Sequence, residues 1–217
     1  MSIASYGRST AFGFALLWTA LGAGLWFVHP ALTAVPAVGL LFTLYFFRDP
    51  HRRVPEGDVN VVSPADGTVV EVAELPSTDD IDRPVIKIGI FLSVLDVHVN
   101  RAPCAGRVRR IDYRPGRFLN AMSPESSGEN EANSVLMETA AHGTVRVRQI
   151  AGKIARRIVC AVAAGDEVAR GQKIGMIKFG SRTELFLEKE RVEEVSVKIG
   201  DKVRGAATVM ARFRGAP

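Results

Sequence analysis

Three short stretches of the sequence carry side chains that could do chemistry. Asp66 lies in "SPADG", His98 lies in "LDVHVNRAP", and Ser181 lies in "FGSR". An acid, an imidazole and a hydroxyl that are far apart in the sequence are the parts needed to activate a nucleophile. The stretch around Ser181 lacks the G-x-S-x-G elbow of many hydrolases, which counts against an ordinary serine hydrolase.

Each of these residues also has an ordinary structural interpretation. "SPADG" is typical of a turn, in which Asp66 caps the bend and the glycine adopts a positive φ. A lone histidine such as His98 is more often structural than catalytic. A Gly-Ser turn such as Gly180–Ser181 is also common. The three stretches therefore indicate a reactive site only in combination.

The elements that must position these side chains are mostly β-strands. After residue 58, short runs rich in valine and isoleucine alternate with Gly, Pro and Asp, as strands and tight turns do. Gly-Asp-x-Val recurs in "AGDEVARG" and "IGDKVRG", which resembles the turns of lipoyl/biotinyl-type domains. We therefore expect a mainly β, compact barrel-sandwich domain with few helices. One helix is expected over residues 150–162, where isoleucine or valine recurs at every fourth position.

The N-terminal part has a different character. Residues 9–47 contain no Asp, Glu, Lys or Arg, and His29-Pro30 divides them into two apolar runs. A membrane-spanning helix needs roughly 20 residues, and each run is just long enough. The His-Pro pair is a natural break between the two helices. We expect an apolar helical hairpin within residues 1–53, followed by a β-rich catalytic domain over residues 54–217. A shallow, re-entrant hairpin is also open, whereas a cleaved signal peptide would explain only the first run.

Charge points to a membrane as the partner. The net charge of +5 favours an anionic surface. Aromatic residues make up 7% of the chain and do not interleave with basic ones, so no nucleic acid is expected. Arginines flank both ends of the apolar region, which places both ends in the cytoplasm by the positive-inside rule. Cys104 and Cys160 lack the spacing of a metal site, and no metal is expected.

Six motifs follow the apolar N-terminus in a characteristic order. They are "FFRDPHR", "SPADGTV", "DVHVNR", "RPGRFLNA", "ENEANS" and "FGSR". Together they resemble the short, single-domain form of phosphatidylserine decarboxylase over essentially the whole chain. The resemblance implies a pyruvoyl-dependent carboxy-lyase of phospholipid biosynthesis. Such an enzyme converts phosphatidylserine into phosphatidylethanolamine and CO2 at the cell membrane, with its catalytic domain on the cytoplasmic face.

The resemblance also implies that the chain cuts itself between Gly180 and Ser181. Ser181 Oγ would attack the Gly180 carbonyl, and elimination from the resulting ester would leave a pyruvoyl group at position 181 after loss of ammonia. The products would be a large chain, residues 1–180, and a small pyruvoyl chain, residues 181–217, which together form a heterodimer. Glycine before the serine leaves the attacked carbonyl open.

By the same resemblance, Asp66 and His98 match the pair that activates the serine. The pyruvoyl group would be the electron sink for decarboxylation. His98 would then protonate the carbanion, since an imidazole can donate a proton near neutral pH. Longer members have a second histidine where this chain has Arg101, so either His98 serves both steps or Arg101 takes an electrostatic part. Arg114 and Arg117 are weaker candidates for binding the lipid phosphate or carboxylate.

The alternative from another class is a membrane-anchored lipoyl/biotinyl-like carrier or adaptor module without catalysis. It would explain the hairpin, the strands and the Gly-Asp repeats. A carrier needs an exposed lysine at a hairpin tip, and Lys178 is the only candidate. Such a module has no use for Asp66, His98 or the Gly-Ser junction.

Overall fold

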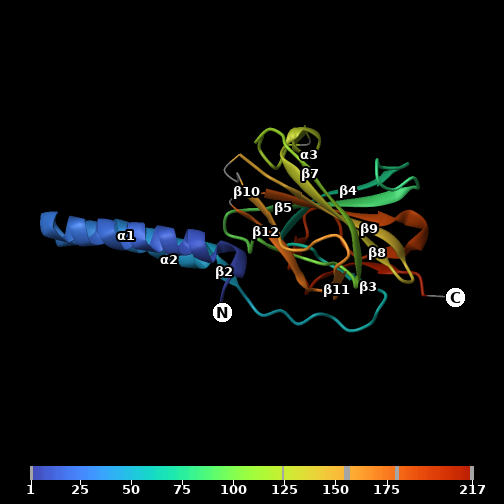
Figure 1. Cartoon of the computed structure of the whole chain (residues 1–217), viewed down its shortest axis with the longest axis horizontal. Helices are drawn as coiled ribbons and strands as arrows, with labels where there is room; N and C mark the ends of the chain where they lie inside the picture. The colour runs from blue at the N-terminus through green and yellow to red at the C-terminus, as the bar shows by residue number, and fades with distance from the viewer. Residues whose placement is uncertain (1, 124, 154–156, 179–180, 216–217) are drawn as a thin grey trace. The chain divides into compact units, whose positions relative to one another are not determined.

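The computed structural model of the protein describes residues 2–123, 125–153, 157–178 and 181–215. The chain divides into two compact units, Met1–His51 and Arg52–Pro217 (Figure 1). The predicted boundary between residues 53 and 54 separates a membrane-associated hairpin from a catalytic domain. It stays a prediction, because the compact units do not show which part carries the activity.

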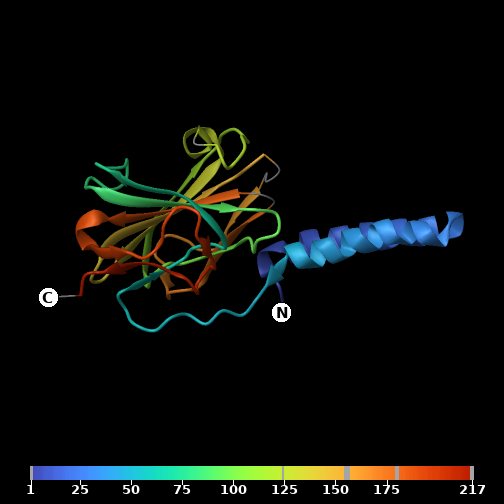
Figure 2. The same cartoon turned by 180° about the vertical axis from the view of Figure 1, so that it is seen from behind.

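The first unit is a helical hairpin, as the apolar runs predict. Its elements are β1 (Ser2–Ile3), η1 (Ser5–Gly7), α1 (Arg8–Val28), η2 (Pro30–Thr33), α2 (Ala34–Phe46) and β2 (Arg48–Asp49). The helices α1 and α2 run side by side in both views (Figures 1 and 2). Trp18 Nε1 donates a hydrogen bond to Thr43 Oγ1 over 3.1 Å. A Cβ atom at Gly39 would lie 2.6 Å from the Trp18 ring, so glycine permits this close packing.

The turn of the hairpin and the length of its first helix follow from the sequence. His29 is extended, Pro30 begins η2, and the His29 ring accepts a hydrogen bond from the Ala31 amide over 3.2 Å. The helical segment Ser5–Val28 is long and apolar enough to cross a membrane, and the second apolar segment, Pro30–Phe46, is shorter. Large apolar side chains such as Phe27 and Leu41 are exposed on the hairpin.

The second unit is built from antiparallel strands with few helices, which confirms the mainly β prediction. The lipoyl-like comparison stays a prediction. The strands are β3 (Asn60–Val62), β4 (Gly67–Leu75), β5 (Val85–Leu92), β6 (Val99–Arg101), β7 (Gly106–Arg114), β8 (Ala132–Thr139), β9 (Gly143–Ile150), β10 (Arg157–Cys160), β11 (Glu167–Val168), β12 (Lys173–Lys178), β13 (Ser181–Glu188), β14 (Val192–Val195), β15 (Lys202–Val203) and β16 (Val209–Phe213). The helices are α3 (Glu125–Glu129) and η3 (Lys189–Arg191).

A curled eight-stranded sheet dominates this unit within the described residues (Figures 1 and 2). Its strand order is β11-β7-β8-β9-β13-β5-β4-β15. Two three-stranded sheets, β10-β12-β6 and β14-β16-β3, complete the unit. Strand β13 therefore lies in the middle of the large sheet, hydrogen-bonded to β9 on one side and to β5 on the other.

The core lies on one face of this sheet, which we call the inner face. Leu185 of β13 stands opposite Ile88 of β5 and Val147 of β9, and all three side chains are fully buried. Side chains alternate between the two faces along a strand. Ser181 therefore lies on the inner face with Leu185, whereas Arg182 lies on the opposite, outer face.

The prediction of a helix over residues 150–162 is wrong for the described part of that segment. Ile150 ends β9, and Arg157–Cys160 forms β10, which pairs antiparallel with β12. A spacing of four residues satisfies the two-residue alternation of a strand as well as the turn of a helix. Residues 154–156 of the expected helix lie outside the described residues.

Candidate active site

Ser181 begins a central strand and is completely buried. It stands opposite Leu92 at the end of β5, and its side chain is on the inner face. Its Oγ atom has no hydrogen-bond partner among the described residues. A buried hydroxyl without a partner is costly and therefore uncommon in native proteins. Ser181 thus has the position of a functional group rather than of a structural one. Its neighbour in the expected cut, Gly180, lies outside the described residues.

The corner between β5 and β6 brings His98 to the same end of the sheet. Asp96 closes this corner, because its Oδ2 accepts hydrogen bonds from the amide of Ser93 over 2.8 Å and from its hydroxyl over 2.7 Å. The amide of Ile177 donates to the carbonyl oxygen of His98 over 3.2 Å. Leu92 therefore stands opposite Ser181 at the start of β13, and His98 lies beside Ile177 near the end of β12.

The orientation of the buried His98 ring fixes its tautomer. His98 Nδ1 lies 2.9 Å from the backbone carbonyl oxygen of Asp96. A carbonyl oxygen can only accept, so Nδ1 carries the hydrogen of this bond. Nε2 is then the nitrogen that can gain and lose a proton. This is the arrangement that a general acid or base requires.

Asp66 lies on a turn that is joined to the strand after His98. The amide of Arg101 in β6 donates to the carbonyl oxygen of Pro64 over 2.9 Å. The Asp66 carboxylate accepts hydrogen bonds from Arg52 Nη2 over 2.6 Å and from the Gly205 amide over 2.8 Å. Burial raises the pKa of Asp66 above its ordinary value, and the Gly205 amide and Arg52 offset only part of this effect. The carboxyl group thus holds its proton more tightly than an exposed aspartate does.

The three arginines singled out in the sequence occupy different environments. Arg101 is buried, and its Nη1 donates to the carbonyl oxygen of Gly171 over 3.1 Å. Arg114 ends β7, and Arg117 lies on the segment that joins β7 to β8; both are exposed. The same segment carries α3 (Figure 1). Arg114 donates to backbone carbonyls of this segment, and Arg117 Nη1 lies 3.1 Å from Glu129 Oε2. Both arginines therefore help to hold this segment in place.

A chain of buried amides, which the sequence motifs did not predict, lies on the inner face beside Ser181. Asn133 Nδ2 donates to Gln149 Oε1 over 3.0 Å, and Gln149 Nε2 donates to Asn100 Oδ1 over 2.9 Å. Asn100 Nδ2 in turn donates to Thr183 Oγ1 over 3.0 Å. The four residues come from β8, β9, β6 and β13 and are buried. They make this end of the inner face polar, whereas the rest of it is lined by aliphatic side chains.

Asn100→Leu is expected to destabilise the protein, because Gln149 and Thr183 would each lose a buried partner. A buried polar group left unpaired costs about 1–3 kcal/mol. Urea unfolding should therefore show a lower midpoint for this variant. Glu193→Leu, at an exposed strand position, is the control and should leave the midpoint nearly unchanged. Equal midpoints for the two variants would mean that the amide chain contributes nothing to stability.

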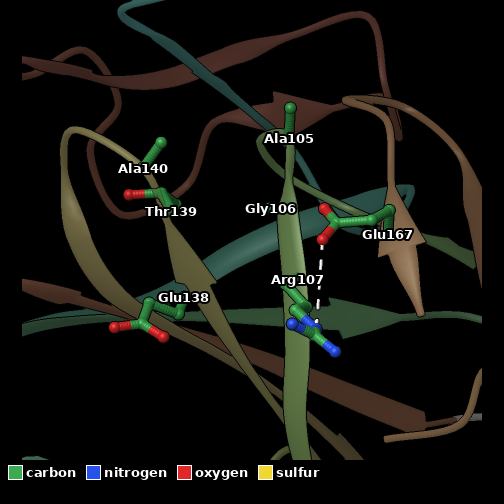
Figure 3. Close-up of a pocket in the computed structure, with 7 residues that line it drawn as sticks. All are labelled: Ala105, Gly106, Arg107, Glu138, Thr139, Ala140 and Glu167. Carbon is green, nitrogen blue, oxygen red and sulfur yellow. Dashed lines mark ion pairs between the residues drawn. The ribbon is translucent and has the colours of Figure 1, made fainter. Parts of the chain in front are cut away.

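An open hollow of about 450 Å3 lies at the end of β7 and β8 that is farther from the amide chain (Figure 3). It is lined by Gly106, Arg107, Glu138 and Thr139, among others, and Arg107 Nε lies 4.0 Å from Glu167 Oε1 beside it. Gly106 begins β7 and Thr139 ends β8, whereas Asn133 of the amide chain lies at the start of β8. This hollow is therefore separate from the end of the sheet that carries Ser181.

Comparison with known proteins gives one consistent result. The sequence profile of the family described as "Phosphatidylserine decarboxylase" matches residues 40–211. A protein from Rhodopirellula baltica named "Phosphatidylserine decarboxylase proenzyme" is 47% identical over 87% of this chain and 78% of its own length. Proteins of the same name from Syntrophus aciditrophicus and Carboxydothermus hydrogenoformans are 43% and 48% identical. The Syntrophus match covers 84% of this chain and 84% of the relative. The Carboxydothermus match covers 81% of each.

Proposed function

The chain belongs to the phosphatidylserine decarboxylase family, and we propose that Ser181, His98 and Asp66 carry out the family's chemistry in it. The protein decarboxylates phosphatidylserine after autocatalytic processing of a proenzyme. Members of this family are generally pyruvoyl-dependent.

The observation that carries the cut site is the environment of Ser181. Its Oγ is buried on the inner face, has no hydrogen-bond partner among the described residues, and belongs to the residue directly after Gly180. A nucleophile without a partner is free to turn toward a neighbouring carbonyl carbon. The residues fit a pyruvoyl group at this position, because the group derives from the serine itself and would occupy the same buried place.

In the proposed self-cleavage, Ser181 Oγ gives its proton to a base and attacks the carbonyl carbon of Gly180. The C–N bond then breaks, the nitrogen of residue 181 takes up a proton, and an ester replaces the amide. Removal of the Ser181 α-proton expels the Gly180 carboxylate and leaves a carbon–carbon double bond. Hydrolysis releases ammonia and leaves the ketone. His98 and Asp66 are the proposed base and its supporting acid, because the raised pKa of Asp66 suits a group that exchanges protons.

In the decarboxylation step, the pyruvoyl group supplies the electron sink for the pair that is released as CO2 leaves. His98 Nε2 donates a proton to the carbon that has lost CO2. The Asp96 carbonyl oxygen holds the ring in place through Nδ1. Arg101 is proposed to act electrostatically nearby. Arg114 and Arg117, at the end of β7 and on the segment with α3, are proposed to attract the lipid phosphate or carboxylate.

We also propose that the protein works at the cytoplasmic face of the cell membrane. Its N-terminal unit carries an apolar helix of membrane-spanning length, and its substrate is a lipid. After cleavage, residues 1–180 and 181–217 would remain together as a heterodimer. The central position of β13 supports this, because the small chain would supply a middle strand of the large sheet.

The carrier alternative is less well supported. Its only candidate attachment lysine, Lys178, is 6% exposed and lies within β12 rather than at an exposed tip. An attached prosthetic group would have to reach solvent from this position. The family membership also favours the enzyme over a module without catalysis.

Intact-mass measurement of the purified, active protein tests the cut site directly. It should show two species, residues 1–180 and residues 181–217, and the second should resist N-terminal sequencing because its first residue lacks an amine. A single full-length chain in an active preparation would contradict the proposal. Two fragments with a different junction would show that the chain is cleaved, but at another site than Gly180–Ser181.

A further inference from the structure

Four charged side chains form a closed ring on the outer face of the sheet, opposite the face of Ser181. We call them the ionic ring: Arg182 and Glu184 of β13, Lys87 of β5 and Glu71 of β4. Glu184 Oε1 lies 2.9 Å from Arg182 Nε and 3.0 Å from Lys87 Nζ. Glu71 Oε2 lies 3.0 Å from Lys87 Nζ and also contacts Arg182 Nη2. Each charge therefore meets at least two of opposite sign, and Glu184 Oε2 also lies 3.9 Å from Arg148 Nη1.

The ionic ring is largely shielded from water. Glu184 is fully buried, and Arg182 and Lys87 are nearly so. Burial alone would raise the pKa of Glu184, but Lys87 and Arg182 lower it below its ordinary value, so this carboxylate is ionised at neutral pH. Lys87 also donates to Ser127 Oγ of α3 over 3.2 Å, which places the segment carrying α3 over the ring.

The neighbouring backbone leaves space for the ring at Gly89. This residue stands opposite Glu184 in the pairing of β5 with β13. A Cβ atom at position 89 would lie 2.7 Å from Arg182 Nη2 and 3.2 Å from Glu71 Cβ. Any larger residue would therefore displace the Arg182 guanidinium from its place over the strand.

The ionic ring joins the two sides of the proposed cut. Glu71 and Lys87 precede it in the sequence, whereas Arg182 and Glu184 follow it, and Arg182 is the residue next to position 181. We propose that the ionic ring fixes the register of the small chain after cleavage and so keeps the group at position 181 on the inner face. Its members are positioning residues in this role, which rests on the proposed cut between Gly180 and Ser181.

The physical reason is the two-residue period of a strand. Cleavage removes the covalent anchor at the start of β13. The small chain is still anchored farther on by β15 and β16, which pair with β4 and β3, so the start of β13 is held mainly by its own strand pairing and side-chain contacts. A slip by one residue would turn position 181 to the outer face and would carry Arg182 and Glu184 onto the buried inner face, away from their ionic partners. Buried charges without partners are strongly unfavourable. The ionic ring therefore makes a one-residue slip of β13 unfavourable at the residues next to the reacting group.

Lys87→Met in the full-length, processed protein tests the proposal. Turnover is expressed per reactive carbonyl, which is counted by labelling with a hydrazine. We expect kcat to fall on the order of 100-fold, as a displacement of about 1 Å in a reacting group can cause, with little change in KM. Lys87→Arg keeps the positive charge and should retain most of the kcat that Lys87→Met loses. The control is Lys189→Met, because the exposed pair Lys189–Glu74 also joins the two sides of the cut. Its kcat should match that of the unsubstituted protein.

A second comparison separates register from general stability. Lys87→Met should lower the thermal midpoint more in the cleaved protein than in the uncut Ser181→Ala chain, where the covalent link still limits slipping. Equal losses in both forms, or a kcat per carbonyl equal to that of Lys189→Met, would overturn the proposal. If Lys87→Met does not fold, the same measurements are made on Gly89→Ala, which displaces Arg182 without removing a charge. An active protein that is never cut would refute the proposed cleavage instead.

Discussion

Replacing Ser181 with alanine leaves the chain in one piece and without decarboxylase activity. In the proposed self-cleavage, the variant lacks the oxygen that attacks the Gly180 carbonyl and then departs in the elimination, so no pyruvoyl group should form. Denaturing electrophoresis and intact mass should show one full-length species, and hydrazine labelling should find no reactive carbonyl. Turnover should fall to background, since the electron sink is missing altogether.

The same variant should fold at least as well as the parent chain. Ser181 Oγ is buried and unpaired among the described residues, so its removal sacrifices no hydrogen bond and relieves a buried polar atom. Ser134→Ala in β8 is the matched control and should be cut normally. Fragments of residues 1–180 and 181–217 from Ser181→Ala would show that another group makes the cut.

The second large effect is expected at His98. His98→Asn keeps a side-chain N–H that can donate to the Asp96 carbonyl but removes Nε2, the proposed proton donor. Loss of a general acid typically costs 10²–10⁴-fold, and we expect kcat of the processed variant to fall by about that factor. Steady-state turnover of the processed variant, expressed per reactive carbonyl, measures this loss.

Two further measurements separate the role of His98 in self-cleavage from its role in turnover. The rate of self-cleavage in His98→Asn shows whether one imidazole serves both steps. If cleavage is normal and only turnover falls, Arg101→Gln becomes the next variant to test for processing. His142→Asn is the control, because the His142 ring stacks on Phe213 at a centroid distance of 4.4 Å and takes no part in the proposed site. Normal turnover by processed His98→Asn would remove His98 as the acid.

Local residue patterns were sufficient to predict the hairpin, the mainly β domain and the turn at Asp66. Gly67 adopts a φ of +152°, and a Cβ atom there would lie 2.2 Å from the Phe91 carbonyl oxygen, so the glycine of "SPADG" is structurally required. These features depend on neighbours in the sequence. The motif order also brought Asp66, His98 and Ser181 to attention, although their roles remain predictions.

The amide chain and the ionic ring could not be predicted in the same way. Asn100, Gln149 and Thr183 meet only because three distant strands place them on one face. An amide within a strand gives no sign of whether its partner is water or another strand. The expected helix at residues 150–162 failed for a related reason. Spacing alone did not distinguish a helix from two strands, and the pairing of β10 with β12 decided the outcome.

The central position of β13 has a consequence for the lifetime of the enzyme. An uncut chain can fold around a continuous connection between β12 and β13, and the proposed cut would then follow in the finished sheet. After the proposed cut, the protein would have lost that connection, and a denatured molecule could regain its sheet only by a second-order encounter between two polypeptides. We therefore expect thermal inactivation of the mature form to be effectively irreversible at low concentration, whereas the uncut Ser181→Ala chain refolds. The enzyme would have one opportunity to fold, before it makes its own cofactor.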